Sequence, residues 1–209
     1  VLEPVSLRNR IAEAVKNMNE KIIISVNDLN LYYGTNHALK DVSMDIQEKS
    51  ITAFIGPSGC GKSTLFSILS EQNIPTSGTI DKYNNSIGFM MQDDCLFEWL
   101  TIYENCILGL LIQNKFTLNE EEYVNNLIHK YGLDEFKNLY PNSLSGGMKQ
   151  RVSLIRTLSL KPDIILMDEP FSALDYTNKL NIIEDIYNIL KSENKTLLLI
   201  THNIDEALL

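Results

Sequence analysis

Two glycine-containing motifs hold the residues best suited to phosphate chemistry, and the first of them is residues 56–64, GPSGCGKST. This stretch fits the pattern G-x-x-x-x-G-K-[ST], in which backbone N–H groups surround nucleotide phosphates and glycines let the backbone approach closely. A chain of this size matches the pattern by chance only about 0.01 times. The motif predicts a phosphate loop formed by Gly56, Pro57, Ser58, Gly59, Cys60, Gly61, Lys62, Ser63 and Thr64.

The side chains of this loop have different expected tasks. Lys62 is expected to reach the β- and γ-phosphates, and the Ser63 hydroxyl is expected to ligate Mg²⁺. Cys60 is expected only to pack, because its thiol adds nothing that the phosphates require. The loop therefore predicts a nucleotide with a bound metal ion.

The second motif is residues 144–150, LSGGMKQ, which places Ser145, Gly146 and Gly147 just before a helical stretch at 148–160. The start of a helix exposes backbone N–H groups and favours an anion. One chain with one nucleotide loop has little use for two such helix ends. We therefore predict that the second end serves the nucleotide of a partner chain, in a dimer with ATP at its interface.

Two adjacent carboxylates, Asp168 and Glu169, come directly after the apolar residues 164–167. Both therefore emerge at the end of a predicted strand. We expect Asp168 to hold Mg²⁺ through water and Glu169 to polarise the attacking water as general base. The alternative is that the pair is merely solvated in a loop.

Gln92 and His202 also stand at the ends of predicted strands, residues 86–91 and 196–200. On the same edge of the sheet as Glu169, the His202 imidazole could bridge the γ-phosphate and the water that the glutamate binds. Each residue has a simpler alternative, as an exposed glutamine or a structural histidine.

Alternating strands and helices must position these residues. Besides those already given, strands are expected at 22–26, 42–46 and 51–55, and helices at 63–69, 102–111, 119–130 and 178–192. This alternation predicts an α/β fold with a largely parallel, doubly wound sheet whose site lies at the carboxyl ends of the strands. In the turn-prone residues 33–36, Tyr33 could stack on adenine or simply pack.

The domain boundaries follow from the same patterns. Leu7, Ile11, Val15 and Met18 recur at helical spacing and predict an extension helix over residues 1–20. Residues 21–209 are expected to form one domain, with a helical subdomain inserted at about 93–158.

Composition narrows the possible functions. A net charge of −9 argues against broad nucleic-acid binding. The three cysteines, Cys60, Cys95 and Cys106, lack the spacing of a disulfide or zinc site, which favours a reducing cytoplasm. No apolar run approaches the length of a membrane span, and the first residues lack the order of a signal peptide. We therefore expect any role at a membrane to depend on a partner.

Taken together, the motifs resemble those of the ATP-binding cassette (ABC) ATPases, from about Ile22 to the C-terminus. Residues 56–64 resemble the Walker A loop, 144–150 the signature motif and 164–169 Walker B with its catalytic glutamate. Gln92 resembles the Q-loop glutamine, and residues 172–175 (Ser172, Ala173, Leu174 and Asp175) resemble the D-loop. His202 resembles the switch histidine, and Tyr33 resembles the aromatic residue that stacks on adenine.

The resemblance implies a P-loop NTPase fold, with a mostly parallel sheet, an N-terminal antiparallel β portion and the inserted helical subdomain. It implies a head-to-tail dimer in which each ATP lies between one Walker A loop and residues 145–147 of the other chain. Asp175 would then contribute to nucleotide binding. The implied catalytic residues are Lys62, Gln92, Glu169 and His202, and the implied magnesium ligands are Ser63, Gln92 and Asp168.

The subfamily pattern is mixed. Up to residue 56 the chain resembles the ATPases of phosphate importers, and from about Ile68 onward it resembles those of nitrate, sulfonate and taurine importers. This mixture is expected of a divergent or recombined sequence. The chain also stops soon after His202, where relatives continue with further strands and helices, so we expect it to be truncated.

The resemblance further implies a function at the inner face of the cell membrane. ATP binding would close two chains, and Gln92 and the helical subdomain would pass that motion to permease subunits, with a solute-binding protein acting indirectly. A small anionic solute would be imported. Two alternatives remain, namely a non-transport ABC ATPase of DNA repair or translation and an inactive nucleotide-binding scaffold. The chain lacks the coiled-coil insertions, zinc modules and tandem cassettes typical of the first, and Gln92, Glu169 and His202 argue against the second.

Overall fold

The computed structural model describes residues 21–171, 183–184, 187–188 and 192–202. Three predicted features lie outside these residues: the extension helix at 1–20, the stretch Ser172 to Asp175, and most of the helix at 178–192.

A four-stranded parallel sheet forms the centre of the molecule. Its strands are β3 (Ile51–Ile55), β7 (Thr196–Thr201), β6 (Ile164–Asp168) and β5 (Ile87–Met90), in that spatial order. Successive side chains of a strand point to opposite faces of the sheet. Strands β6 and β7 are apolar on both faces because a hydrophobic core covers each face. Ile165, Met167, Leu197 and Leu199 enter one core, whereas Ile164, Leu166, Leu198 and Ile200 enter the other.

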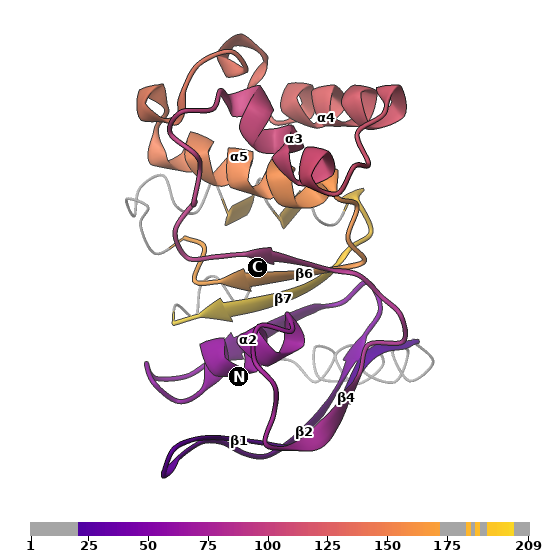
Figure 1. The fold of residues 1–209 in the computed structure, drawn as a ribbon, viewed down its shortest axis with the longest axis vertical. Coiled ribbons are helices and arrows are strands. Elements are labelled where there is room, and N and C mark those ends of the chain that lie inside the picture. Colours follow the sequence, from indigo (N-terminus) through magenta and orange to yellow (C-terminus); the bar gives the residue numbers. More distant parts are fainter. Residues whose placement is uncertain (1–20, 172–182, 185–186, 189–191, 203–209) are drawn as a thin grey trace, which may run out of the picture.

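A second sheet is antiparallel and contains β2 (Asn36–Gln47), β1 (Ile22–Tyr33) and β4 (Ser77–Asp81), in that order. The hairpin between β1 and β2 turns at Gly34 and Thr35, so the predicted turn is confirmed. The helix α2 (Lys62–Leu69) packs between the two sheets with Phe66 fully buried (Figure 1). The antiparallel portion and the parallel sheet are therefore both present as predicted.

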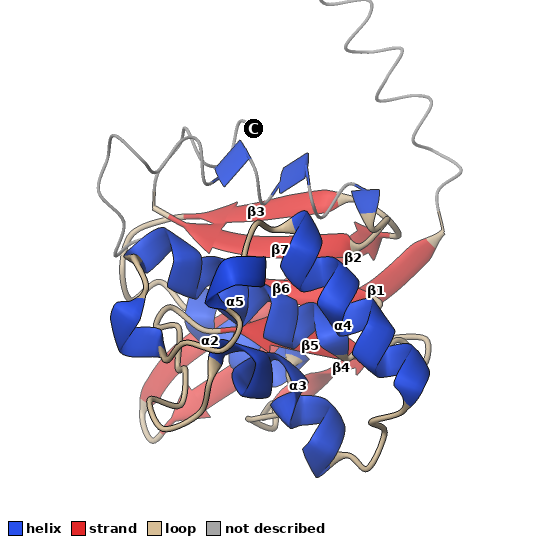
Figure 2. Ribbon diagram, turned by 90° about the horizontal axis from the view of Figure 1, so that it is seen from above, coloured by secondary structure: helices blue, strands red, loops and turns tan. Residues whose placement is uncertain are grey.

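Three helices cover the opposite face of the parallel sheet: α3 (Ile102–Ile112), α4 (Leu118–Lys130) and α5 (Gly146–Ser159) (Figures 1 and 2). Short 3₁₀ turns, Asp134–Phe136 and Pro141–Ser143, lie between α4 and α5. These helices begin and end close to the predicted helices, and most of them fall within the expected subdomain. The exact boundaries of that subdomain remain a prediction.

Helix α5 packs closely on the sheet at Gly88 of β5. A Cβ at this position would lie 2.7 Å from Cγ2 of Thr157 and 2.9 Å from Cγ of Pro162. The absence of a side chain at Gly88 therefore lets α5 pack directly on β5. No helix in the described part of the chain is long and apolar enough to cross a membrane.

Candidate functional site

The phosphate loop connects β3 to α2, as the motif requires. Gly61 precedes the first residue of α2 and has a φ of +102°, a value that L-amino acids with side chains rarely adopt. A Cβ here would lie 2.7 Å from the Ala38 carbonyl oxygen and 2.9 Å from Cδ2 of Leu39. Both the backbone conformation and the packing against β2 therefore require glycine.

The loop folds around the ammonium group of Lys62. Its Nζ donates hydrogen bonds to the carbonyl oxygens of Gly56, at 2.7 Å, and Pro57, at 3.0 Å, and lies 3.8 Å from Sγ of Cys60. Beside it is a polar pocket of about 200 Å³. Its lining residues are Ser58, Gly59, Gly61, Lys62, Ser63, Thr64 and Glu169.

Asp168 ends strand β6 next to this loop. Its carboxylate accepts a hydrogen bond from the Ser63 side chain. Partial burial raises the pKa of Asp168 above its ordinary value, and the charge of Glu169 adds to the rise, while the Ser63 bond and the charge of Lys62 oppose it. The structure thus brings together a hydroxyl and a carboxylate, both of which were predicted magnesium ligands.

Glu169 and His202 lie together at the carboxyl ends of two neighbouring strands, β6 and β7. The Oε2 atom of Glu169 is 3.1 Å from Nδ1 of His202. Glu169 has a φ of +45°, and its backbone N–H donates to the Ile200 carbonyl at 3.0 Å. Such a φ costs energy in a residue with a side chain and is often found at functional sites. Here it accompanies a carboxylate that reaches the phosphate pocket.

Other predicted residues do not line this pocket in the described structure. Gln92 is exposed two residues beyond β5. Ser145 caps α5, where its Oγ accepts from the Met148 backbone N–H at 3.4 Å. Gly146 follows it at the surface, and Gly147 is partly exposed. The three residues Ser145, Gly146 and Gly147 are therefore separate from the phosphate loop of their own chain.

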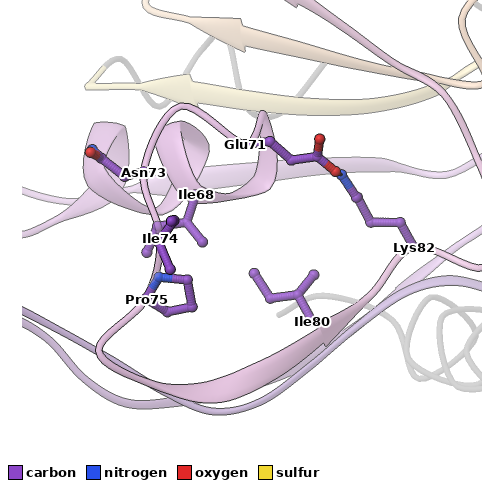
Figure 3. A pocket seen from close by; sticks show the side chains of 7 residues that line it. All are labelled: Ile68, Glu71, Asn73, Ile74, Pro75, Ile80 and Lys82. Atoms are coloured by element: carbon purple, nitrogen blue, oxygen red, sulfur yellow. The ribbon is translucent and has the colours of Figure 1, made fainter.

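Tyr33 is half-exposed at the tip of the first hairpin, and its hydroxyl accepts a hydrogen bond from Nδ2 of Asn73 at 3.1 Å. Asn73 also lines a second pocket, of about 280 Å³, between α2 and β4. Figure 3 shows apolar side chains in this pocket and an ion pair between Glu71 and Lys82 at its edge. The full lining is Ile68, Glu71, Asn73, Ile74, Pro75, Ile80 and Lys82, none of which belongs to the predicted nucleotide site.

The sequence predictions missed two polar residues near Gln92, namely Asn105 and Arg156. Both donate to backbone carbonyls of the segment that follows Gln92. For Arg156, the sequence offered one signal. It is a charged residue four positions after Val152 and directly after Ile155, both of which are apolar residues of the same predicted helix. Asn105 carried no comparable signal.

Comparison with known proteins agrees with this geometry. A family model described as ABC transporter matches residues 39–172. The chain belongs to the ABC transporter family. It is the ATP-binding subunit type of that family, with the P-loop NTPase fold, and it binds and hydrolyses ATP.

Two curated relatives illustrate the likeness in sequence. The taurine import ATP-binding protein of Pelagibacter ubique is 41% identical over 182 residues, which cover 84% of this chain and 69% of the relative. The aliphatic sulfonates import ATP-binding protein of Bacillus cereus is 35% identical over 196 residues, covering 88% and 77%.

Two solved structures illustrate the likeness in fold. The cbiO1 protein of Clostridium perfringens, part of the ABC transporter complex cbiONQ, gives a TM-score of 0.80 at 30% identity, covering 89% of this chain and 80% of that one. The ATP-binding cassette MJ0796, a dimer in a post-hydrolysis state bound to ADP and Pi, gives a TM-score of 0.73 at 30% identity, covering 88% and 90%.

Proposed function

We propose that this ATPase energises the import of a small anionic solute through membrane permease subunits. The relatives that support this proposal are named for the import of taurine, aliphatic sulfonates and sulfate or thiosulfate, all of which carry a sulfur oxyanion. Nitrate and phosphate stay within the proposed class because the chain also resembles their importers. The subunit would act at the inner, cytoplasmic face of the membrane.

In the chemical step, Glu169 is the proposed general base. Its carboxylate lines the pocket that Lys62 and Ser63 also line, so it can reach a water beside the terminal phosphate. His202 is proposed to orient that carboxylate and to contact the γ-phosphate. The single observation that carries this proposal is the contact of 3.1 Å between Glu169 Oε2 and His202 Nδ1 at the edge of the pocket.

The phosphate loop itself would bind the negatively charged phosphate oxygens. Lys62 is proposed to bind the β- and γ-phosphates with its ammonium group, and the backbone N–H groups of residues 58–64 to bind their oxygens. These groups are fixed before the reaction by the backbone of α2 and its preceding glycine. They can therefore stabilise charge in the transition state without much reorganisation.

The residues beside the loop fit a magnesium ion. Mg²⁺ prefers oxygen ligands and is usually held by one or two protein groups, with phosphates and waters completing its shell. The Ser63 hydroxyl and the Asp168 carboxylate already lie in hydrogen-bonding contact. We propose that they hold the ion, with Gln92 as a third ligand, and that it would neutralise phosphate charge when bound.

The proposed site is completed by a second copy of the chain. Ser145, Gly146 and Gly147 begin α5, whose N–H groups suit an anion, yet they lie away from their own phosphate pocket. A head-to-tail dimer would bring them to the partner's nucleotide, and the structurally similar MJ0796 is a dimer. Tyr33 is proposed to stack on adenine, and Asp175, outside the described residues, to contribute at the interface.

The Glu169→Gln variant tests the proposed chemistry. We expect phosphate release to fall by at least about 100-fold, the usual contribution of a general base, with ATP affinity unchanged. Glu48→Gln is the matched control, because Glu48 lies at the end of the antiparallel sheet beside Lys21 and should leave turnover intact. Full hydrolysis by Glu169→Gln would refute the assigned base.

The solute is tested by co-purifying the ATPase with its permease and measuring hydrolysis in proteoliposomes. Stimulation by taurine, a sulfonate, sulfate, nitrate or phosphate would support the proposed class. Stimulation only by solutes that carry no oxyanion group would contradict it.

A further inference from the structure

Arg156 joins helix α5 to the segment that follows Gln92. Its two terminal nitrogens donate hydrogen bonds to the carbonyl oxygens of Cys95, at 2.6 Å, and Asp94, at 2.7 Å. The second nitrogen also lies 3.3 Å from Oγ of Ser153, one turn earlier on the same helix. The planar guanidinium therefore holds two consecutive backbone carbonyls with fixed geometry.

The other end of this segment is held by Asn105 of α3, which is fully buried. Its Oδ1 accepts from the Phe97 backbone N–H at 2.8 Å. Its Nδ2 donates to the carbonyls of Phe97, Leu100 and Thr101 at 3.1, 3.2 and 3.0 Å. In between, the Leu96 side chain is buried in the core that α3, α4 and α5 form with one face of the parallel sheet.

The hydrogen bonds of Arg156 and Asn105 attach residues 94–101 to α5 and α3. Strand β5 ends at Met90, so only Met91, Gln92 and Asp93 connect the sheet to the attached segment, and all three are exposed. A change in the position of Gln92 is therefore passed first to the backbone that Arg156 holds.

Arg156 lies on α5, which Ser145 caps and which runs without interruption from Gly146 to Ser159. Arg156 is the eleventh residue after Ser145, a separation of about 16 Å along the helix. Because each internal N–H of the helix bonds to the preceding turn, we expect α5 to move as one unit.

We propose that Arg156 is a positioning residue that couples Gln92 to Ser145. It fixes the segment after Gln92 to α5. When nucleotide binding in one active site displaces Gln92, α5 therefore moves with the segment, and its N-terminus at Ser145 moves relative to the other active site. This inference rests on the proposed function, since it takes Gln92 and Ser145 as nucleotide-contacting residues. Lysine cannot replace arginine here, because one ammonium group lacks the fork that binds both carbonyls.

Trp99 gives this coupling a direct spectroscopic readout. It is the single tryptophan of the chain, it is 71% exposed, and it lies in the attached segment. Its ring contacts Phe97 edge-on, with the ring centroids 5.1 Å apart. A movement of the segment on nucleotide binding should therefore change its emission.

The experiment titrates the full chain with Mg²⁺ and a non-hydrolysable ATP analogue, and follows Trp99 emission and analogue binding separately. Wild type should give a saturable change in emission. Arg156→Lys should bind the analogue within about twofold of wild type, lose at least two thirds of the emission change at saturation, and show about 10-fold lower kcat with KM within twofold. Thermal unfolding of both proteins checks that the variant is folded.

Arg151→Lys is the matched control, because Arg151 is on the same helix but donates to the carbonyl of Tyr131, at 3.4 Å. It should retain the wild-type emission change. The inference is overturned if wild type shows no emission change at saturation, or if Arg156→Lys keeps its full amplitude. It is also overturned if Arg156→Lys loses analogue binding in parallel with the signal. A wild-type chain that gives the emission change but releases no phosphate contradicts the proposed chemistry and leaves the coupling supported.

Discussion

At the scale of single residues, the ionised carboxylate of Asp168 lowers the free energy of unfolding, and its partly buried position explains why. Burial raises the pKa of this carboxyl, and the neighbouring charge of Glu169 raises it further, because both disfavour the ionised form. Ionised Asp168 therefore destabilises the isolated chain at neutral pH. Such perturbed groups concentrate at functional sites, where a metal ion or substrate reverses the cost.

Asp168→Asn should make the chain more stable at pH 8 while abolishing hydrolysis. Because the folded-state pKa lies above the unfolded one, the folded chain loses stability as Asp168 ionises, and asparagine removes that loss. We expect a higher Tm than that of wild type at pH 8, because asparagine carries no charge for burial to disfavour. The gain should shrink toward pH 4, where the wild-type carboxyl is increasingly protonated.

Thermal unfolding at both pH values checks this prediction. Asp45→Asn is a suitable control, since Asp45 also accepts a bond from a serine hydroxyl, Ser25 Oγ at 2.7 Å, but is exposed on the antiparallel sheet. An equal gain in both variants, or a loss in Asp168→Asn at pH 8, would count against the explanation.

The sequence predicted the placement of some site residues but not the contacts of others. Glu169 and His202 each follow an apolar strand, so their common sheet edge could be expected, and the structure places them 3.1 Å apart. The contacts of Arg156 could not be expected, because its partners are backbone carbonyls in a loop. Every residue has a backbone carbonyl, and the sequence does not indicate in which direction a loop carbonyl points.

At the scale of elements, the strands of the antiparallel sheet were the hardest to predict. Residues 77–81, SGTID, contain one apolar side chain and form β4 only because β1 offers its edge. Strand β1 continues past Val26 to Tyr33 through an irregularity at Asp28, whose φ is +46°. Tertiary pairing overrides weak local preference at both places.

The parallel strands and the helices were predicted more closely. Strand β3 begins and ends at the expected residues, and α3, α4 and α5 each lie within two residues of the expected bounds. Their patterns are strong because one core lies on each face of the sheet. Asn105 was not predicted, since an asparagine in an apolar helix shows its importance only through its contacts.

Asn105→Ala should cost about 2–3 kcal/mol of unfolding free energy. The variant leaves a part-buried backbone N–H and several carbonyls around residues 97–101 without their partner. Urea denaturation measures the cost. Asn126→Ala makes the same change at an exposed site of α4 and should stay within about 0.5 kcal/mol of wild type. Equal stabilities of the two variants would contradict the role given to Asn105.

At the scale of the whole molecule, the two anion-binding helix ends lie on different layers. Helix α2, which follows the phosphate loop, is on one face of the parallel sheet, whereas α5 is on the other (Figure 1). Sequence reasoning anticipated two separate ends from the presence of two motifs. It could not give their relative placement, which depends on the order of the strands.

Ser145→Arg should prevent ATP-driven pairing without preventing nucleotide binding. The bulky cation would occupy the helix end proposed to meet the partner's phosphates, while the phosphate loop remains intact. Sedimentation velocity of the variant in the Glu169→Gln background, with ATP, should show monomer where Glu169→Gln alone shows dimer. Asn126→Arg adds the same charge on α4 and should leave pairing unchanged. Dimer formation by Ser145→Arg would argue against the shared site.

The dependence of specific ATPase activity on protein concentration tests the shared site most directly. Each nucleotide is proposed to need residues of two chains, so phosphate release per chain should fall steeply as the protein is diluted below its dimerisation constant at saturating ATP. Adding the catalytically inactive Glu169→Gln chain at low concentration should alter the rate through mixed dimers. A specific activity that stays constant over a thousandfold dilution, and is indifferent to the added variant, would contradict the account.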